Sequence, residues 1–332
     1  MKATRFSFVL HLHQPVGNFD CVFREHATEV YLPLLKRLTE GGVLPLGVHV
    51  SGPLIAWLAD HEPGFIELIR RHVEDGSIEL LTSGRYEPIL AALSPADRAD
   101  QLQGMSDLLR KHFGCDARTL WLTERVWEDT IVPELVGAGV ETVLVDDWHF
   151  RVSGHDPSTL VCPFRTEVGG VGLNVLPISE QLRYLIPFSE AAQIGDHFRD
   201  LAEREVPLAL FGDDGEKFGG WPRTREWVWD SGWIHAFVDV VLDAADRGWL
   251  EWVTPSEAVQ QIPSGGLAYL GSASYSEMEE WTLPPSLSGP YRTLKDHVDS
   301  ASAHGGLDRA ADPQARIRGS HWRNFLVRYP EA

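Results

Sequence analysis

Seven short, almost continuously apolar segments recur along this chain, with helix-like stretches between several of them. Runs of this kind are typical of parallel strands that are buried on both faces. Strands that alternate with helices predict βα units around a parallel sheet, either open or closed into a barrel. The predicted strands cover residues 5–13, 43–50, 77–83, 118–123, 141–147, 171–178 and 206–214.

Two of the intervening stretches carry clear helix signals. Residues 64–76 repeat apolar side chains at helical spacing and stop at Gly76. Residues 94–114 begin with Ser94, a good N-cap, which is followed by Pro95 in the first turn. Both features are common where helices begin and end, so each stretch is predicted to be a helix.

The charge of the chain restricts its partners. Acidic residues outnumber basic ones by 48 to 29, which gives a net charge of −19 at pH 7. This balance argues against nucleic acid or an anionic membrane as a partner. No apolar run approaches the ~18 residues of a transmembrane helix, and the N-terminus reads as a strand rather than a signal peptide. Three cysteines without a C-x-x-C pair favour a reducing compartment, so we expect a cytoplasmic protein.

Polar and ionisable side chains gather at the C-terminal ends of the predicted strands. The first strand ends in His11 and His13, the fourth is followed by Glu124, and the last ends in Asp214. In parallel barrels and open α/β sheets, ligands bind at this end of the strands. We therefore expect these side chains to converge on one face and to form an active site.

Glu124 stands among apolar residues in the stretch WLTERVWE. A buried carboxylate is costly unless it is paired or functional. One interpretation is a salt bridge that closes the strand, and the other is a catalytic acid or nucleophile. The motif alone leaves both open.

Carboxylates and aromatic rings dominate the chemistry expected on this face. Of the twelve tryptophans, Trp121, Trp221 and Trp281 stand beside the polar motifs. Aromatic rings pack against the apolar faces of sugars, and paired carboxylates are the usual equipment of glycoside hydrolysis. For any one of the twelve, a place in the core is the better explanation, and only for Trp121 and Trp221, beside candidate catalytic carboxylates, are the two explanations equal.

Other motifs for metals and cofactors are weak. His11 and His13 share one face of a strand because side chains alternate with period two, and with a carboxylate they could hold zinc. No spacing fixes a third ligand, so we expect both imidazoles to bind hydroxyls, with no metal and no cofactor. The chain has no P-loop and no G-x-S-x-G motif.

Five motifs in order resemble those of glycoside hydrolase family 57, and within it the 4-α-glucanotransferase and α-amylase-like members. They are HLHQP (11–15), SIELLTSG (77–84), WLTERVWE (121–128), FGDDGEKFG (211–219) and ASYSEMEEW (273–281). The resemblance implies an incomplete (β/α)7 barrel, which agrees with the seven predicted strands, and a C-terminal extension that is mainly helical.

The resemblance also implies roles for individual residues. Glu124 takes the position of the family nucleophile, and Asp214 that of the acid/base. Further positions are implied to bind substrate: His13, Glu79, Trp121, Glu216, Trp221 and Trp281, to which the strand argument adds His11.

These features together predict the organisation and the activity of the chain. We expect residues 1–262 to form the catalytic barrel and residues 263–332 to form a loop and helical segment that completes the cleft. The C-terminal β-sandwich of longer relatives is expected to be absent. The expected function is a retaining 4-α-glucanotransferase acting on α-1,4-glucans or maltooligosaccharides. The alternatives are an α-amylase-type hydrolase with the same site, a carbohydrate-binding protein without catalysis, and a metal-dependent deacetylase-like enzyme. Nothing in the sequence specifies an oligomeric state.

Overall fold

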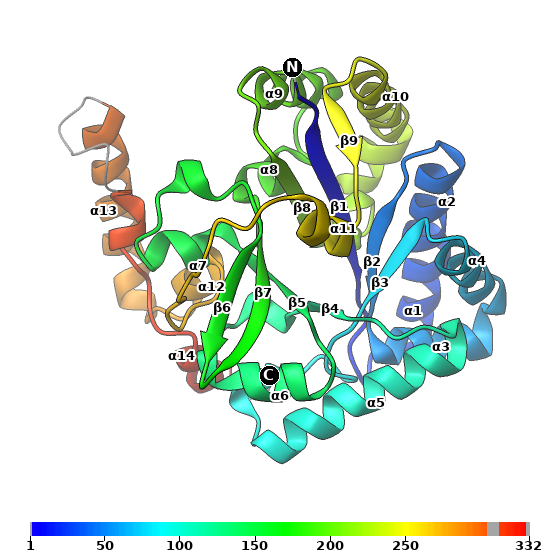
Figure 1. The fold of residues 1–332 in the computed structure, drawn as a ribbon, viewed down its shortest axis with the longest axis horizontal. Helices are drawn as coiled ribbons and strands as arrows, with labels where there is room; N and C mark the ends of the chain where they lie inside the picture. The colour runs from blue at the N-terminus through cyan, green and yellow to red at the C-terminus, as the bar shows by residue number, and fades with distance from the viewer. Residues whose placement is uncertain (1, 304–311, 330–332) are drawn as a thin grey trace.

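Seven parallel strands form the centre of the molecule in the computed structural model, which describes residues 2–303 and 312–329. They coincide with the seven predicted segments and confirm the predicted fold class (Figure 1). Their bounds are β1 (Thr4–Leu12), β2 (Leu46–Val50), β3 (Ile78–Leu81), β4 (Thr119–Trp121), β5 (Thr142–Asp146), β7 (Val171–Ile178) and β8 (Leu208–Asp214).

The strands follow one another around an incomplete barrel. One sheet has the order β3-β2-β1-β8, and a second contains β4-β5-β7. At one junction the amide of Thr82 donates to the carbonyl of Thr119 (2.8 Å), and at the other the amide of Ser179 donates to the carbonyl of Leu210 (2.9 Å). The amide of Trp121 also donates to the carbonyl of Thr82 (2.9 Å), so isolated backbone hydrogen bonds join the two sheets where no continuous ladder is formed.

Two additional strands escape the sequence analysis. β6 (Phe164–Val168) pairs antiparallel with β7, and β9 (Leu250–Trp252) pairs with the first half of β1. β6 alternates buried and exposed side chains, unlike the continuous apolar runs of the barrel strands, and β9 has only three residues. Both therefore lack the signal by which the parallel strands are recognised.

Helices cover the outside of the barrel, and the two predicted ones are present (Figure 1). In α5 the Ser94 side chain accepts from the amide of Asp97, and Gly114 ends the helix with a φ of 68°. The helices up to residue 261 are α1 (Asp20–His26), α2 (Leu32–Glu40), α3 (Gly52–His61), α4 (Pro63–Glu74), α5 (Pro95–Phe113), α6 (Val132–Gly137), α7 (Asp147–Val152), α8 (Glu180–Leu185), α9 (Ala191–Glu203), α10 (Trp233–Asp246) and α11 (Pro255–Gln261).

The alternation of side chains along β1 divides the core into two parts. Phe6, Phe8 and Leu10 point outward into the apolar layer beneath the helices. Val9 belongs to a smaller cluster, which also contains residues of β3, β4, β5, β7 and β8. Ala258 of α11 packs into the same cluster, so this helix closes the end of the barrel where the strands begin. The opposite end stays open for a site.

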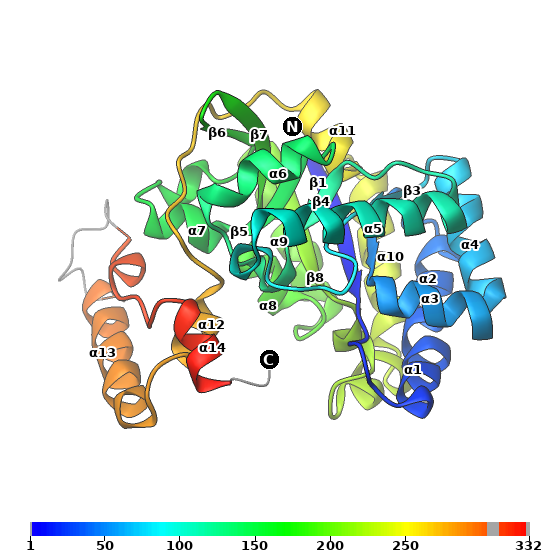
Figure 2. The same ribbon diagram turned by 90° about the horizontal axis from the view of Figure 1, so that it is seen from below.

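The segment after residue 262 is mainly loop and helix, as expected. It contains α12 (Ser276–Trp281), α13 (Pro285–Ala303) and α14 (Arg323–Arg328). Figure 2 shows α12 and α14 beside each other, with α13 at the outer edge of the molecule. Trp322 is buried and packs into the cluster beside β4 and β5, which anchors the segment to the barrel. Within residues 2–303 and 312–329, no helix combines the length and apolarity needed to cross a bilayer.

Candidate active site

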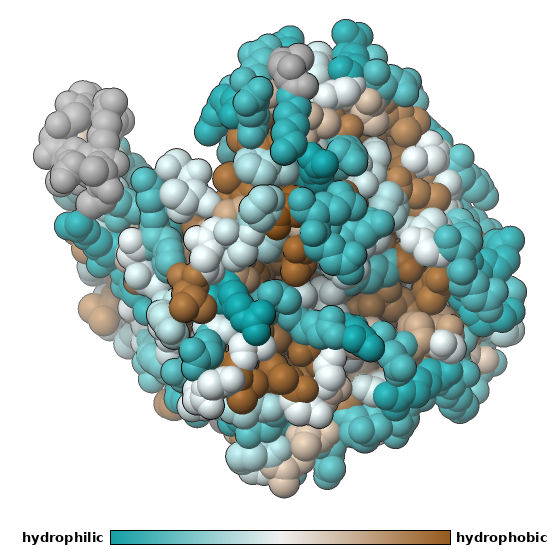
Figure 3. Space-filling view, viewed as in Figure 1, coloured by the Kyte–Doolittle hydropathy of each residue, from teal (hydrophilic) through white to brown (hydrophobic). Residues whose placement is uncertain are grey.

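A cleft of about 490 Å³ opens at the C-terminal ends of the barrel strands. The structure brings Glu124, Asp214, His11, His13 and Trp281 together there, as the sequence predicts. Figure 3 shows the opposite face of the molecule, on the side of α11, where hydrophilic side chains cover most of the outer helices. The cleft is lined by His11, His13, Glu87, Pro88, Ile89, Thr123, Glu124, Asp214, Tyr275, Trp281 and Phe325.

The register of β1 and β8 explains which of two adjacent aspartates enters the cleft. His11 pairs with Asp214 across the two strands. Because Val9 and Leu210 face the interior, period-two alternation turns His11 and Asp214 inward as well. Asp213 points the opposite way and is fully buried. Strand geometry therefore selects Asp214, rather than Asp213, to face a ligand.

The carboxyl groups of Asp214 and Glu216, at the end of β8 and just after it, both hold their protons more tightly than usual. Burial, followed by the charge of Asp213, raises the pKa of Asp214 to about 6. Burial, followed by the charge of Asp214, raises the pKa of Glu216 to about 8. The hydroxyl of Tyr31 and the amide of His13 both donate to Oε1 of Glu216. Glu216 therefore lies behind His13, where it can support the cleft wall.

Glu124 lies in a short 3-10 turn, Thr123–Arg125, directly after β4. Its neighbours Trp121, Leu122 and Val126 are buried, as expected. Glu124 itself is exposed in the cleft, which corrects the expectation of a buried carboxylate. Its backbone is left-handed, with φ 51° and ψ 16°, and this conformation turns the side chain out of the packed layer.

A buried ionic network lies behind the catalytic face. Arg125 pairs with Asp146 at 3.3 Å, and Arg183 bridges Asp146 and Asp213 at 3.0 and 3.2 Å. Lys217 also pairs with Asp213. Among the described residues, no ion pair involves Glu124, so the structural salt bridge considered for this stretch belongs to Arg125. The network pairs the buried carboxylates of Asp146 and Asp213 with cations and so ties the end of β5 to the end of β8.

Histidines form the side of the cleft along β1 and β2. Nδ1 of His11 lies 2.7 Å from Nδ1 of His49, and Nε2 of His49 lies 3.3 Å from Oε1 of Glu87. Burial lowers the pKa of both His11 and His13. The ring of Trp121 stacks on His11 at 4.7 Å between centroids. Neutral imidazoles fixed in this way can exchange hydrogen bonds with sugar hydroxyls.

The structure also supplies the third metal-ligand candidate that no sequence spacing identified. Ligand atoms of His11, His13 and Glu87 all lie within 4.8 Å of one another. Two imidazoles and a carboxylate are a donor set that zinc accepts.

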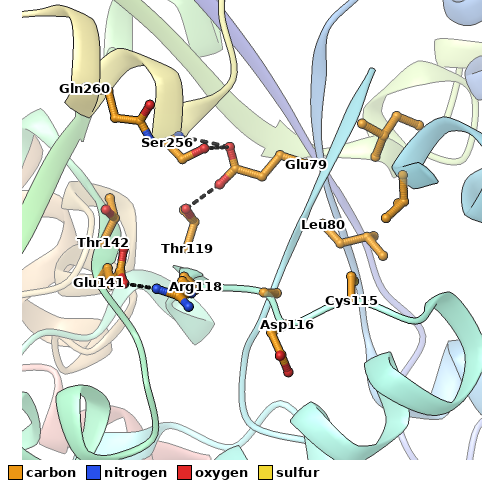
Figure 4. Close-up of a pocket in the computed structure, with 13 residues that line it drawn as sticks. Glu79, Leu80, Cys115, Asp116, Arg118, Thr119, Glu141, Thr142, Ser256 and Gln260 are labelled. Carbon is orange, nitrogen blue, oxygen red and sulfur yellow. Dashed lines mark hydrogen bonds and ion pairs between the residues drawn. The ribbon is translucent and has the colours of Figure 1, made fainter. Parts of the chain in front are cut away.

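Glu79 does not line this cleft, which corrects the expectation for that residue. Its side chain faces inward, but Glu79 pairs with Gly47 and Gly47 pairs with Val9. Glu79 therefore lies at the height of Val9 in the barrel, two residues nearer the closed end than His11. Figure 4 shows its carboxylate between Ser256 and Thr119. It accepts from the Thr119 hydroxyl (2.5 Å) and from the amide (2.9 Å) and hydroxyl (2.8 Å) of Ser256. Glu79 thus fastens α11 to the closed end of the barrel.

The remaining predicted residues take different places. Trp121 is buried beneath His11, whereas Trp281 is 51% exposed and lines the cleft. Trp221 is 41% exposed and does not line it; Nζ of Lys217 lies 5.2 Å from its ring centroid, and the ring of Phe188 is 6.4 Å away. An exposed ring of this kind is available to a longer ligand outside the cleft.

Sequence reasoning did not assign Glu87, Tyr275 or Tyr31 to the site. Glu87 and Tyr275 line the cleft, and Tyr31 donates to Glu216. Glu87 follows a predicted strand, and polar residues after strand ends are the pattern used to predict the site, so this pattern could have identified it. Tyr275 comes from a loop inside the motif ASYSEMEEW (273–281), which was the signal that could have identified it, whereas Tyr31 comes from a helical segment outside all five motifs.

The arrangement suits acid–base and nucleophilic chemistry at one bond. The cleft offers an exposed carboxylate, a second carboxyl group whose proton is held up to about pH 6, and neutral imidazoles. Trp281 adds an exposed aromatic surface at the rim. A carboxylate and a carboxylic acid that face one ligand are what glycoside cleavage requires.

Comparison with known proteins points in the same direction. The family model described as glycosyl hydrolase family 57 matches residues 7–271. The 4-alpha-glucanotransferase of Thermococcus litoralis is 38% identical over 333 residues, covering 100% of this chain and 49% of the relative. The alpha-amylase of Pyrococcus abyssi is 40% identical, covering 100% of this chain and 49% of the relative.

A solved structure is similar over the whole chain. The crystal structure of 4-alpha-glucanotransferase from Thermococcus litoralis matches with a TM-score of 0.89 and 38% identity, covering 100% of this chain and 51% of that one. The chain therefore spans about half the length of the curated relatives it matches.

Proposed function

The chain belongs to glycosyl hydrolase family 57, and from this we propose that it acts on α-1,4-glucans as a retaining 4-α-glucanotransferase. We assign Glu124 as the nucleophile and Asp214 as the acid/base. The observation that carries the proposal is that the two carboxyl groups line one cleft and differ in character. Glu124 is exposed, whereas Asp214 keeps its proton up to about pH 6.

In the first step, the ionised carboxylate of Glu124 attacks the anomeric carbon of the glucan. The bond to the leaving oxygen breaks, and the carboxyl proton of Asp214 passes to that oxygen. A covalent glycosyl-enzyme results, and the shortened glucan leaves with a free hydroxyl. This mechanism expects the two carboxyl groups to lie ~5–5.5 Å apart, the spacing for retention.

In the second step, the carboxylate of Asp214 takes a proton from the acceptor hydroxyl. The acceptor oxygen attacks the anomeric carbon, and Glu124 is released with its original charge. A sugar hydroxyl as acceptor gives transfer, and water gives hydrolysis. The two reactions therefore share one site and differ only in what occupies the acceptor position.

The other polar and aromatic residues of the site are assigned to the sugar. His11 and His13 are neutral at neutral pH and can exchange hydrogen bonds with hydroxyls. Trp281 offers an exposed face at the rim, and Trp221 offers a second one farther out. Trp121 and Glu216 hold His11 and His13 from behind rather than touching sugar themselves. We propose that the reaction needs neither metal nor cofactor.

The relatives also support a second candidate from the same family. The relative from Pyrococcus abyssi is named an alpha-amylase at 40% identity, so hydrolysis of the same glucans is the alternative. A binding protein without catalysis would have no need for Asp214 to hold a proton opposite an exposed Glu124. We further propose a cytoplasmic location, because all three cysteines are free thiols.

Product sizing after incubation with maltotriose tests the proposal. Products longer than the substrate indicate transfer, and a set containing only shorter sugars indicates hydrolysis. Maltotriose that is bound but not converted would leave the binding protein as the correct interpretation. A Glu124→Gln variant is the matched control, because it keeps the size of the side chain and loses the nucleophile.

A further inference from the structure

Two consecutive non-glycine residues hold a left-handed backbone at the nucleophile. Glu124 has a φ of 51° and Arg125 a φ of 47°. A residue held in this region costs on the order of 1 kcal/mol or more, and it persists only where its surroundings impose it. The turn that presents Glu124 must therefore be held by contacts from elsewhere in the chain.

Those contacts come mainly from residues 273–275, which follow the barrel in the sequence. The Ser274 hydroxyl donates to the carbonyl of Glu124 at 2.6 Å. Ala273 and Trp127 exchange backbone hydrogen bonds of 2.8 and 3.2 Å just beyond the turn. On the opposite side, Nε2 of His149 lies 2.7 Å from the carbonyl of Arg125. The strained turn is thus fastened on both sides, and its outer fastening belongs to the segment after residue 262.

The next residue of that segment reaches the carboxylate itself. The hydroxyl of Tyr275 donates to Oε2 of Glu124 at 2.5 Å. Tyr275 is only 7% exposed, and the guanidinium of Arg125 lies 4.4 Å from the centroid of its ring. The ring is therefore fixed between the cleft and the buried ionic network, and its hydroxyl has one direction in which to point.

We propose that Tyr275 is a positioning residue for the nucleophile: its hydroxyl holds the Glu124 carboxylate in the attacking orientation, and residues 273–275 clamp the turn that carries it. The inference rests on the proposed function, because it assigns Tyr275 a task only if Glu124 attacks the sugar. It also makes the segment after the barrel part of the catalytic machinery.

The other charged and titratable groups around Glu124 have partners or roles of their own, so Tyr275 is the residue that can orient the Glu124 carboxylate. His13, just after β1, and Asp214, at the end of β8, face the carboxylate, and Arg125 follows it in the turn. Arg125 pairs with Asp146, Asp214 is needed as acid and base, and burial lowers the pKa of His13. Burial, followed by the charge of Glu124, raises the pKa of Tyr275, so its hydroxyl stays a neutral donor over the working pH range.

Replacing Tyr275 by phenylalanine tests the proposal, because the ring stays and only the donor is lost. A hydrogen bond to a charged group is worth enough to lower kcat about 10- to 100-fold when it is removed. Maltooligosaccharide affinity, measured in an Asp214→Asn background to stop turnover, should change less than about twofold, since the variant removes no sugar contact.

Tyr184→Phe is the matched control. The hydroxyl of Tyr184 also donates to a carboxylate, Oε1 of Glu277, at 2.5 Å, but neither residue lines the cleft. Its kcat should equal that of the wild type. Ser274→Ala provides an independent second variant, because it removes the contact to the Glu124 carbonyl without touching the carboxylate, and it should lower kcat with unchanged affinity.

The outcomes separate the inference from the function on which it rests. A wild-type protein that converts no glucan would refute the proposed function. An active wild type with Tyr275→Phe and Ser274→Ala at full kcat would refute the positioning role alone. A Tyr275→Phe variant that loses affinity as much as kcat would show a merely structural tyrosine. A lower kcat with unchanged affinity supports the proposal.

Discussion

Replacing Glu216 by glutamine should make the protein less sensitive to alkaline pH. Burial and the nearby charge of Asp214 raise the pKa of Glu216 from 4.5 to about 8. A carboxyl group whose pKa is higher in the folded than in the unfolded state favours folding only while it is protonated. The free energy of unfolding therefore falls as the pH rises from about 4.5 to about 8, and it stays low above that range.

The size of this loss of unfolding free energy follows from how far the pKa of Glu216 is raised. Each tenfold change in proton affinity is worth about 1.4 kcal/mol, so the upper limit is about 5 kcal/mol. Because the side chain is only partly buried, we expect about 2–4 kcal/mol. Glutamine keeps an oxygen that can accept from Tyr31 and from the amide of His13, so the variant should match the wild type at pH 5.

Urea denaturation of both proteins at pH 5 and pH 9 measures the effect. The wild type should lose more unfolding free energy between these pH values than Glu216→Gln, which keeps only the smaller loss contributed by Asp214. Glu25→Gln, a change at an exposed position of α1, should behave as the wild type does. If Glu216→Gln and the wild type lose the same free energy to within about 1 kcal/mol, Glu216 is ionised at neutral pH and the reasoning fails.

Three further predictions concern the roles of Glu124 and Asp214, the protonation of Asp214, and the histidines. With an α-glucosyl fluoride that bears a glucan tail, azide should rescue Asp214→Ala to an α-azide and Glu124→Ala to a β-azide, and reversed anomers by NMR would exchange the two roles. Because Asp214 must be protonated to donate, kcat/KM should decline as the pH rises through about 6, and a flat profile there would exclude it as the acid. Activity should survive exhaustive chelation, whereas loss of activity together with bound zinc would assign His11 and His13 to a metal.

The sequence by itself determined the elements and the direction in which their side chains point. Continuous apolar runs located all seven barrel strands, because strands buried on both faces leave that mark in the chain. Period-two alternation placed His11 and Asp214 on the inner face. Helix caps such as Ser94 are equally local, and the structure confirms that one.

The tertiary structure decided height within the barrel and contacts between distant segments. Glu79 faces the interior of the barrel as predicted, but it lies nearer the closed end than the cleft. Its height depends on which residues pair across the sheet, and the sequence of one strand does not specify that pairing. The exposure of Glu124 depends on a strained turn held from residues 273–275, about 150 positions away. Tyr275 reaches the cleft through long-range packing against the turn of Glu124, and its contact with that carboxylate cannot be read from neighbours in the chain. Periodicity is a property of neighbours along the chain, whereas a site is a property of neighbours in space.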